Sequence, residues 1–226
     1  SVYGVGQPDQ VLDEASPVNP QTAYAECKVK VERDVGAMAG DDFEPCFLRN
    51  ATAYGASPRQ RFDIVLNDLC GLAWTVKQIK LVSDGSPWRP LVHALDMCQA
   101  VHLSLTAPAE SVRGQIYNVG STEQNYRVID IARIVAEEFP GCELIVGQPG
   151  ADNRSYRVNF DKIQRVLPQF SCRWSASSGA KQMHELFRRI DMTEAEFRAP
   201  PYTRLAMLMK HRKAGLLDDK LFWTFP

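Results

Sequence analysis

The sequence predicts an α/β fold with parallel strands, because segments with helical spacing of apolar residues alternate with short strand-like segments. Two of the strand-like segments, residues 43–50 and 115–119, have the apolar composition of central strands. Two strands make a sheet too small to be covered by helices on both faces. We therefore expect the 226-residue chain to be the second part of something larger.

The individual elements follow from the apolar spacing and from the turn-forming residues between them. Helices are predicted at residues 22–38, 62–76, 94–105, 128–139, in a short stretch after Asp161, and two or three times between residues 175 and 213. Strands are predicted at residues 43–50, 80–82, 91–92, 115–119, 143–146 and 155–160. Asp96 and Asp161 are expected to cap the helices beside them, and Asn118 is expected to form a turn.

Composition and charge are those of an ordinary globular protein. Hydrophobic residues make up 45% of the chain and charged residues 23%, with a net charge of −1 and a pI near 6.4. This balance gives no reason to expect binding to nucleic acid or to an anionic membrane, and no apolar run reaches membrane-spanning length. The first residues do not have the pattern of a signal peptide. The four histidines have no metal-ligand spacing, so no metal is expected.

The six cysteines are widely spaced, and no two of them form a C-x-x-C pair. Several lie in apolar periodic segments, as buried thiols do. The even number would allow a disulfide framework, but the spacing favours a reduced, cytoplasmic protein.

The segment "YAECK" places a tyrosine and a lysine four residues apart, at Tyr24 and Lys28. Residues with this spacing share one face of a helix. A positive charge beside a phenol favours the ionised phenol, so the pair is suited to proton transfer. The alternative interpretation is that Tyr24 packs in the interior and the stem of Lys28 covers it.

Six segments occur in order along the chain: "SVYG", "YAECK", "FLRNATAYG", "SDGSPWRPLVHALDM", "YNVG" and "RSYRVNFDKI". With these segments the sequence resembles the extended short-chain dehydrogenase/reductase family, in its NAD-dependent nucleotide-sugar epimerase/dehydratase branch. The resemblance covers about residues 1–190. It implies a partial Rossmann domain, a doubly wound parallel sheet, with a smaller α/β substrate-binding lobe. Residues 1–60 and 90–120 would belong to the Rossmann domain, and residues 61–89 and 121–226 to the lobe.

Two parts of the family's site are not found in the sequence. The third catalytic residue, a Ser or Thr, would lie upstream of Ser1. The glycine-rich dinucleotide fingerprint is also missing, because "GVGQPD" follows no strand and opens no helix. The chain is therefore expected to be a C-terminal portion that by itself neither binds NAD(P) nor turns over. The alternative is a non-catalytic fragment that keeps only the substrate lobe.

The resemblance implies that Tyr24 is the catalytic base and that Lys28 is its partner, and that both contact NAD or NADP. Tyr54 is placed near the cofactor. The implied substrate is a nucleotide-diphosphate sugar, and the full-length protein is expected to be a homodimer.

Three residues are assigned to the substrate by the same resemblance. Thr52 stands where the family commonly has an asparagine that contacts the diphosphate or sugar. Arg89 matches an arginine that binds the diphosphate, for which the guanidinium fork is suited. Relatives place another phosphate-binding arginine in the region where Arg154 and Arg157 flank Tyr156; Arg154 is favoured over Arg157, because strand alternation puts Arg157 on the opposite face from Tyr156.

The reaction type is inferred from Ser1. Dehydratases of the branch usually carry glutamate at this position, whereas serine cannot act as a carboxylate base. The sequence therefore favours a nucleotide-diphosphate-sugar epimerase, with an NDP-4-keto-sugar reductase as the alternative.

Overall fold

The structure, a computed structural model, describes residues 2–4, 6, 10–150 and 155–225. Within these ranges the strands fall into four small groups, one of which is the predicted central pair. β2 (Phe47–Asn50) pairs in parallel with β6 (Ile116–Val119). This pairing confirms the predicted α/β fold with parallel strands.

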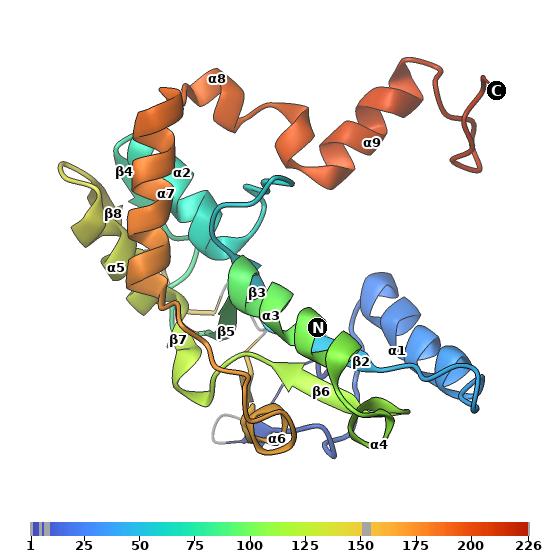
Figure 1. Ribbon diagram of the computed structural model, residues 1–226. Helices are drawn as coiled ribbons and strands as arrows, with labels where there is room; N and C mark the ends of the chain where they lie inside the picture. Colours follow the sequence, from blue (N-terminus) through green and yellow to red (C-terminus); the bar gives the residue numbers. More distant parts are fainter. Residues whose placement is uncertain (1, 5, 7–9, 151–154, 226) are drawn as a thin grey trace.

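Helices α3 (Ala94–Thr106) and α6 (Asp161–Val166) cover one face of the β2–β6 pair, with α4 (Ala109–Val112) in the connection to β6 (Figure 1). Ala100 of α3 and Ile163 of α6 are fully buried against Tyr117 and Val119 of β6. α1 (Ala23–Gly36) lies to the side of the pair, where Val29 packs against the N-terminal residues. The start of the chain and the start of α1 therefore meet beside β2.

The remaining strands form three further groups. β3 (Thr52–Tyr54) pairs in parallel with β5 (Trp88–His93), which pairs antiparallel with β7 (Asn125–Arg127). Two further parallel pairs join β4 (Gln78–Lys80) to β8 (Glu143–Ile145) and β1 (Val11–Leu12) to β9 (Arg157–Val158). A single 3₁₀ turn, η1 (Thr122–Gln124), precedes β7.

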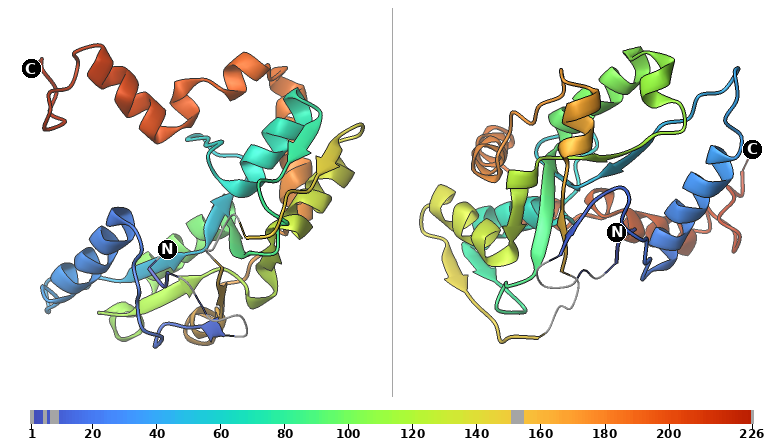
Figure 2. Two further views of the ribbon diagram at one scale, coloured as in Figure 1. Left: turned by 180° about the vertical axis from the view of Figure 1, so that it is seen from behind. Right: turned by 90° about the horizontal axis from the view of Figure 1, so that it is seen from below.

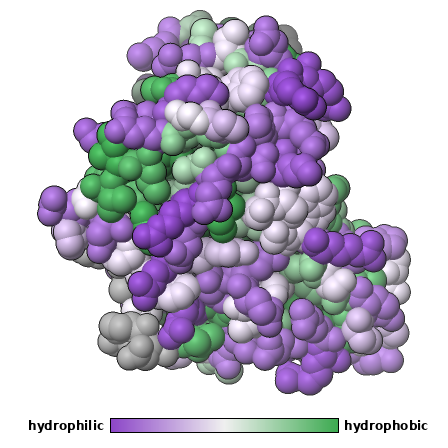
Figure 3. Space-filling model, turned by 90° about the vertical axis from the view of Figure 1, so that its left-hand side faces the viewer, coloured by the Kyte–Doolittle hydropathy of each residue, from purple (hydrophilic) through white to green (hydrophobic). Residues whose placement is uncertain are grey.

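The largest hydrophobic cluster lies among α2 (Val65–Thr75), α5 (Val128–Glu138) and α7 (Ala176–Ile190). Leu66, Ile131 and Phe187, one from each helix, are fully buried there. Burial of a side chain of this size contributes about 1.5–3 kcal/mol, so this cluster is a major source of stability. On the side of the molecule shown in Figure 3, hydrophilic residues cover most of the surface. Hydrophobic residues gather in one contiguous patch at the left edge of this view.

Residues 194–225, which we call the C-terminal arm, extend away from these helices (Figures 1 and 2). The arm contains α8 (Glu194–Phe197), the 3₁₀ turn η2 (Pro200–Tyr202) and α9 (Arg204–Lys213). Its first part is anchored, because Phe197 is buried against Phe62. Its last part exposes apolar side chains, namely Leu205, Met209, Leu221, Phe222, Trp223 and Phe225.

The cap of α3 corrects a prediction from the sequence. His93, not Asp96, is the N-cap residue, and its Nδ1 accepts the backbone N–H of Leu95 at 3.1 Å. The carboxylate of Asp96 instead accepts the backbone N–H groups of Arg173 and Trp174, at 3.1 and 3.2 Å. Asp96 therefore fixes the segment that leads into α7.

Two other local predictions are also wrong. Asp161 is the first residue of α6 rather than its N-cap, and its carboxylate accepts hydrogen bonds from Thr122 and Asn159. Asn118 lies buried inside β6 rather than in a turn. In both cases a polar side chain is held by a distant segment that a local pattern cannot reveal.

Several element boundaries differ from the prediction. The strand expected at residues 80–82 is formed by Gln78–Lys80, and of residues 155–160 only Arg157–Val158 form a strand. α2 begins at Val65 rather than at residue 62, and its N-cap residue Ile64 has extended backbone angles. The backbone N–H of Phe62 is bonded to the carbonyl oxygen of Tyr202 at 3.1 Å.

All six cysteines are free thiols in the structure, so the disulfide framework is not formed. In the described part of the chain, the helices are too short or too polar to cross a membrane. The same ranges contain no group of three or more metal-binding side chains. The assignment of residues to two lobes stays a prediction.

Candidate active site

Helix α1 sets the positions of Tyr24 and Lys28. The helix begins after Thr22, whose hydroxyl accepts the backbone N–H of Ala25 at 3.2 Å and so caps the first turn. Residues four apart then follow one another on the same face, which brings Lys28 next to Tyr24. The Lys28 ammonium lies 5.5 Å from the centroid of the Tyr24 ring.

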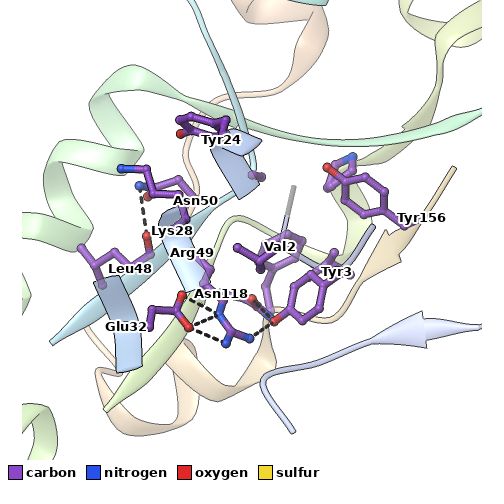
Figure 4. Close-up of a pocket in the computed structure, with 14 residues that line it drawn as sticks. Val2, Tyr3, Tyr24, Lys28, Glu32, Leu48, Arg49, Asn50, Asn118 and Tyr156 are labelled. Atoms are coloured by element: carbon purple, nitrogen blue, oxygen red, sulfur yellow. Dashed lines mark hydrogen bonds and ion pairs between the residues drawn. The ribbon is translucent and has the colours of Figure 1, made fainter. Parts of the chain in front are cut away.

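Both side chains line a cavity of about 200 Å³, which we call the floor cavity (Figure 4). Tyr24 is 62% exposed, and Lys28 is exposed as well. The alternative in which Tyr24 packs in the interior is therefore excluded. Both polar groups are accessible to a ligand, which is the geometry that proton transfer requires.

A hydrogen-bonded network lies at the bottom of the floor cavity (Figure 4). Arg49 on β2 forms an ion pair with Glu32 on α1 at 2.6 Å, and both side chains are largely buried, at 9% and 15% exposed. Arg49 also donates to the hydroxyl of Tyr3 at 3.0 Å, and this hydroxyl donates to Oδ1 of Asn118 at 2.6 Å. The network thereby joins the N-terminal segment, α1, β2 and β6.

Tyr3 and Tyr24, two of the three tyrosines that line the floor cavity, differ in burial and in hydrogen bonding. Tyr3 is only 5% exposed, and burial raises the pKa of its phenol although the hydrogen bond from Arg49 opposes this shift. Tyr3 is therefore a neutral hydrogen-bond donor at ordinary pH. Its hydroxyl is already shared between Asn118 and Arg49, whereas that of Tyr24 is open to the cavity.

A second cavity, of about 810 Å³, opens on the other side of Tyr24, and we call it the wide cavity. It is lined by β3, by the loop that follows β3 and by the beginning of α3. Tyr24, Asn50, Ala51 and Tyr156 line both cavities. Tyr24 therefore lies at the junction, within reach of ligands in either cavity.

The turn after β3 shapes the wide cavity. Gly55 has a φ of +96°, and a Cβ at this position would lie 2.1 Å from Nε2 of His93. Glycine is therefore required here on both conformational and steric grounds. The backbone N–H of Gly55 donates to the buried side chain of Asn67 at 2.9 Å, and Asn67 also lines the cavity.

The predicted cofactor and substrate residues on β3 have different surroundings. Thr52 is partly exposed and lines the wide cavity. Tyr54 lines it too, but is only 1% exposed, because its ring packs edge-on against His93 with centroids 5.2 Å apart. The structure thus places Tyr54 mainly in the hydrophobic core, and its contact with a cofactor stays a prediction.

Of the two predicted phosphate-binding arginines, the structure describes only Arg89. Arg89 lies on β5, where its guanidinium donates to the carbonyl oxygen of Trp88 at 2.8 Å, and it is not part of the lining of the floor or wide cavity. Arg154 lies outside the described residues.

Several site residues were not identified from the sequence. Arg59 and Arg61 line the wide cavity from the loop after β3, and their position directly after the "TAYG" segment was the available signal. Tyr156 lines both cavities and follows a predicted arginine in sequence. Arg204 reaches the wide cavity from the C-terminal arm, and no local pattern marks it.

Comparison with known proteins places this geometry in a family. The sequence model described as the NAD dependent epimerase/dehydratase family matches residues 1–120, just over half of the chain. The match includes Tyr24, Lys28 and the whole β2–β6 pair.

Individual relatives are similar over parts of their length. The chain is 28% identical over 101 residues to UDP-D-apiose/UDP-D-xylose synthase of Oryza sativa subsp. japonica. This alignment covers 41% of this chain and 24% of that protein. Among solved structures, it is similar to TunA, an NAD-dependent NDP-hexosamine 5,6-dehydratase of tunicamycin biosynthesis, with a TM-score of 0.69 and 25% identity. The alignment covers 83% of this chain and 60% of TunA.

MoeE5, solved in complex with UDP-glucuronic acid and NAD, is similar with a TM-score of 0.68 and 26% identity, over 84% of this chain and 62% of MoeE5. The chain thus spans about 60% of the length of these two solved relatives.

Proposed function

The chain belongs to the NAD-dependent epimerase/dehydratase family, and we propose that its protein is a nucleotide-diphosphate-sugar epimerase in which Tyr24 transfers the proton. The observation that carries the proposal is the position of Tyr24, which lines both the floor cavity and the wide cavity. A proton-transfer group must reach the substrate while it stays next to the cofactor. The position of Tyr24 between the two cavities supports both contacts.

The floor cavity fits the nicotinamide end of NAD or NADP. The ammonium of Lys28 is a hydrogen-bond donor and the phenol of Tyr24 is both donor and acceptor, which together suit a ribose diol. These two residues would hold the ribose, and NAD when bound would supply the hydride acceptor and donor. The relatives TunA and MoeE5 are described with NAD, which supports this choice of cofactor class.

Tyr24 performs the acid–base part of the reaction. Removal of hydride from a carbinol carbon becomes easier as its hydroxyl loses a proton, and Tyr24 in its phenolate form would take that proton and become the neutral phenol. The ammonium of Lys28 lies 5.5 Å from the centroid of the Tyr24 ring, so a positive charge stands beside the group that exchanges the proton. Tyr24 returns the proton when the keto sugar is reduced on its other face. One group that takes and returns a proton is sufficient for inversion at one carbon.

Thr52 would contact the sugar from the wall of the wide cavity. Arg89 and Arg154 stay candidates for the diphosphate. The preference for epimerase over dehydratase derives from Ser1, which lies outside the described residues. Serine can hydrogen-bond, but elimination of water calls for a group that acts as an acid or base near neutral pH.

The test uses the whole natural protein with a panel of UDP-, GDP-, dTDP- and CDP-sugars, analysed by NMR of the products. We expect inversion at one sugar carbon without added cofactor. NADPH-dependent reduction of a 4-keto sugar would instead assign a reductase, and release of a 4-keto-6-deoxy sugar would show that the inference from Ser1 is wrong. No turnover of any nucleotide sugar would contradict the proposal.

A further inference from the structure

The turn that follows β3 forms part of the wall of the wide cavity, and it is hydrogen-bonded to α7. Gly55 and Ser57 of this turn line the cavity. Between them, the backbone N–H of Ala56 donates to Oε1 of Gln182 on α7 at 2.8 Å. Ala56 and Gln182 are not part of the described lining of the floor cavity or of the wide cavity. The contact therefore acts on the shape of the wall and not on a ligand directly.

The same amide oxygen is bonded to His93, the N-cap residue of α3. Nε2 of His93 lies 2.9 Å from Oε1 of Gln182. Nδ1 of the ring accepts the backbone N–H of Leu95 at 3.1 Å, so this nitrogen carries no proton. Burial lowers the pKa of His93 and favours the neutral ring, whose single proton is then on Nε2. His93 therefore donates to Gln182, and the amide oxygen of Gln182 accepts two hydrogen bonds.

The ring of His93 is fixed by its packing. It is fully buried and stacks on the ring of Trp174, with centroids 4.0 Å apart and an angle of 9° between the planes. The ring of Tyr54 meets it edge-on, with centroids 5.2 Å apart. Because two rings hold His93, its Nε2–H fixes the position of the Gln182 oxygen, which in turn fixes the backbone of Ala56.

We propose that Gln182 is a positioning residue of the wide cavity, which links the turn after β3 to His93 and thereby sets the affinity for the nucleotide sugar. The inference rests on the proposed function and goes beyond it, because Gln182 acts through the turn and lines neither cavity. A turn without this anchor occupies several positions, and the apparent affinity falls with the fraction of molecules that have the binding-competent one. Tyr24 lies on α1, so the chemical step keeps its rate once the substrate is bound.

The first experiment measures KM and kcat of the whole protein with the nucleotide sugar that the panel identifies. Gln182→Met keeps the length of the side chain without the acceptor, and Gln182→Asn keeps an amide but withdraws it by one methylene. Both are expected to raise KM about tenfold, the size of one lost hydrogen bond, and to leave kcat unchanged. Gln182→Glu retains an acceptor at the same distance and should keep KM near that of the unmodified protein. Lys181→Met is the control, because Lys181 is exposed and precedes Gln182 on α7.

The second experiment follows backbone amide exchange at residues 55–57 by mass spectrometry, which needs no substrate. Gln182→Met and Gln182→Asn are expected to exchange faster there than the unmodified protein, whereas Gln182→Glu and Lys181→Met should not. Exchange and KM that are the same in Gln182→Met and in Lys181→Met would overturn the inference. Faster exchange with an unchanged KM would overturn it as well, because the turn would then not determine affinity.

The inference and the proposed function fail in different ways. If the unmodified protein turns over no nucleotide sugar, the epimerase is rejected. In that case, exchange at residues 55–57 that is faster in Gln182→Met than in Lys181→Met still supports Gln182 as the anchor of this turn, and equal exchange overturns it.

Discussion

Two arginine–carboxylate pairs stand on opposite sides of Tyr24, and they differ mainly in burial. Arg49 and Glu32, below the floor cavity, are 9% and 15% exposed and 2.6 Å apart. Arg61 and Asp63, at the wide cavity, are 33% and 29% exposed and 2.8 Å apart. The same chemistry therefore serves two purposes. The buried pair joins α1 to β2, whereas the more exposed pair links two residues of the segment between β3 and α2.

The largest expected difference between the two pairs is in stability. Glu32→Ala leaves the charge of Arg49 buried without its partner and is expected to lower the free energy of unfolding by about 3–5 kcal/mol. Asp63→Ala removes a partner that water can replace, and is expected to cost at most about 1 kcal/mol. Urea unfolding of both variants measures the difference. Equal losses would show that burial does not distinguish the two pairs.

A smaller loss is expected when the network is altered at Tyr3. Tyr3→Phe removes the hydroxyl that donates to Asn118 and accepts from Arg49, so two buried polar groups lose a partner. The expected cost is about 1–3 kcal/mol in urea unfolding. Tyr126→Phe provides a control, because Tyr126 packs at the edge of the large hydrophobic cluster, away from both cavities. A Tyr3→Phe variant as stable as this control would contradict the network's role.

The stability contributions of Tyr3, at the floor cavity, and of Asp63, beside the wide cavity, should be lost at opposite ends of the pH scale. Burial raises the pKa of Tyr3 above its usual 10.0, so the folded protein binds more protons there than the unfolded chain does. Its contribution to stability is present below pH 10 and is lost as the pH rises through the folded value. The hydrogen bond from Arg61 lowers the pKa of Asp63 below 3.8, so its contribution is present above pH 3.8 and is lost as the pH falls.

The free energy of unfolding as a function of pH checks both signs. Tyr3→Phe is expected to flatten the decline above pH 10, and Asp63→Asn to flatten, by a smaller amount, the decline below pH 3.8. A Tyr3→Phe variant with an unchanged alkaline decline would contradict the assignment to Tyr3.

The parts of the molecule that the sequence predicts well are those with local signals. The parallel pairing of β2 with β6 follows from two short apolar segments. The common face of Tyr24 and Lys28 follows from their spacing and from the Thr22 cap at the start of α1. The strand character of each segment and the shared helical face depend on neighbours within a few residues, so a pattern in the sequence is sufficient to predict them.

The features that sequence reasoning missed depend on distant segments. Tyr3 and Asn118 are 115 positions apart in sequence, so the strand pattern at residues 115–119 does not show which partner the Asn118 side chain will have. Arg204 reaches the wide cavity only because Phe62 anchors the C-terminal arm. Asp96 was expected to cap α3, but the neighbouring His93 does so and Asp96 binds a later segment. Such choices are decided by tertiary packing, which local propensity does not contain.

The measurement that tests the central claim most directly is the rate of sugar epimerisation by the whole protein with Tyr24→Phe. The account predicts that the rate falls by about 10²–10⁴-fold, which is the usual contribution of a positioned acid–base group. It also predicts an unchanged urea midpoint, because Tyr24 is 62% exposed. Tyr126→Phe should leave both quantities unchanged. A Tyr24→Phe variant that keeps the rate of the unmodified protein would contradict the claim that Tyr24 transfers the proton.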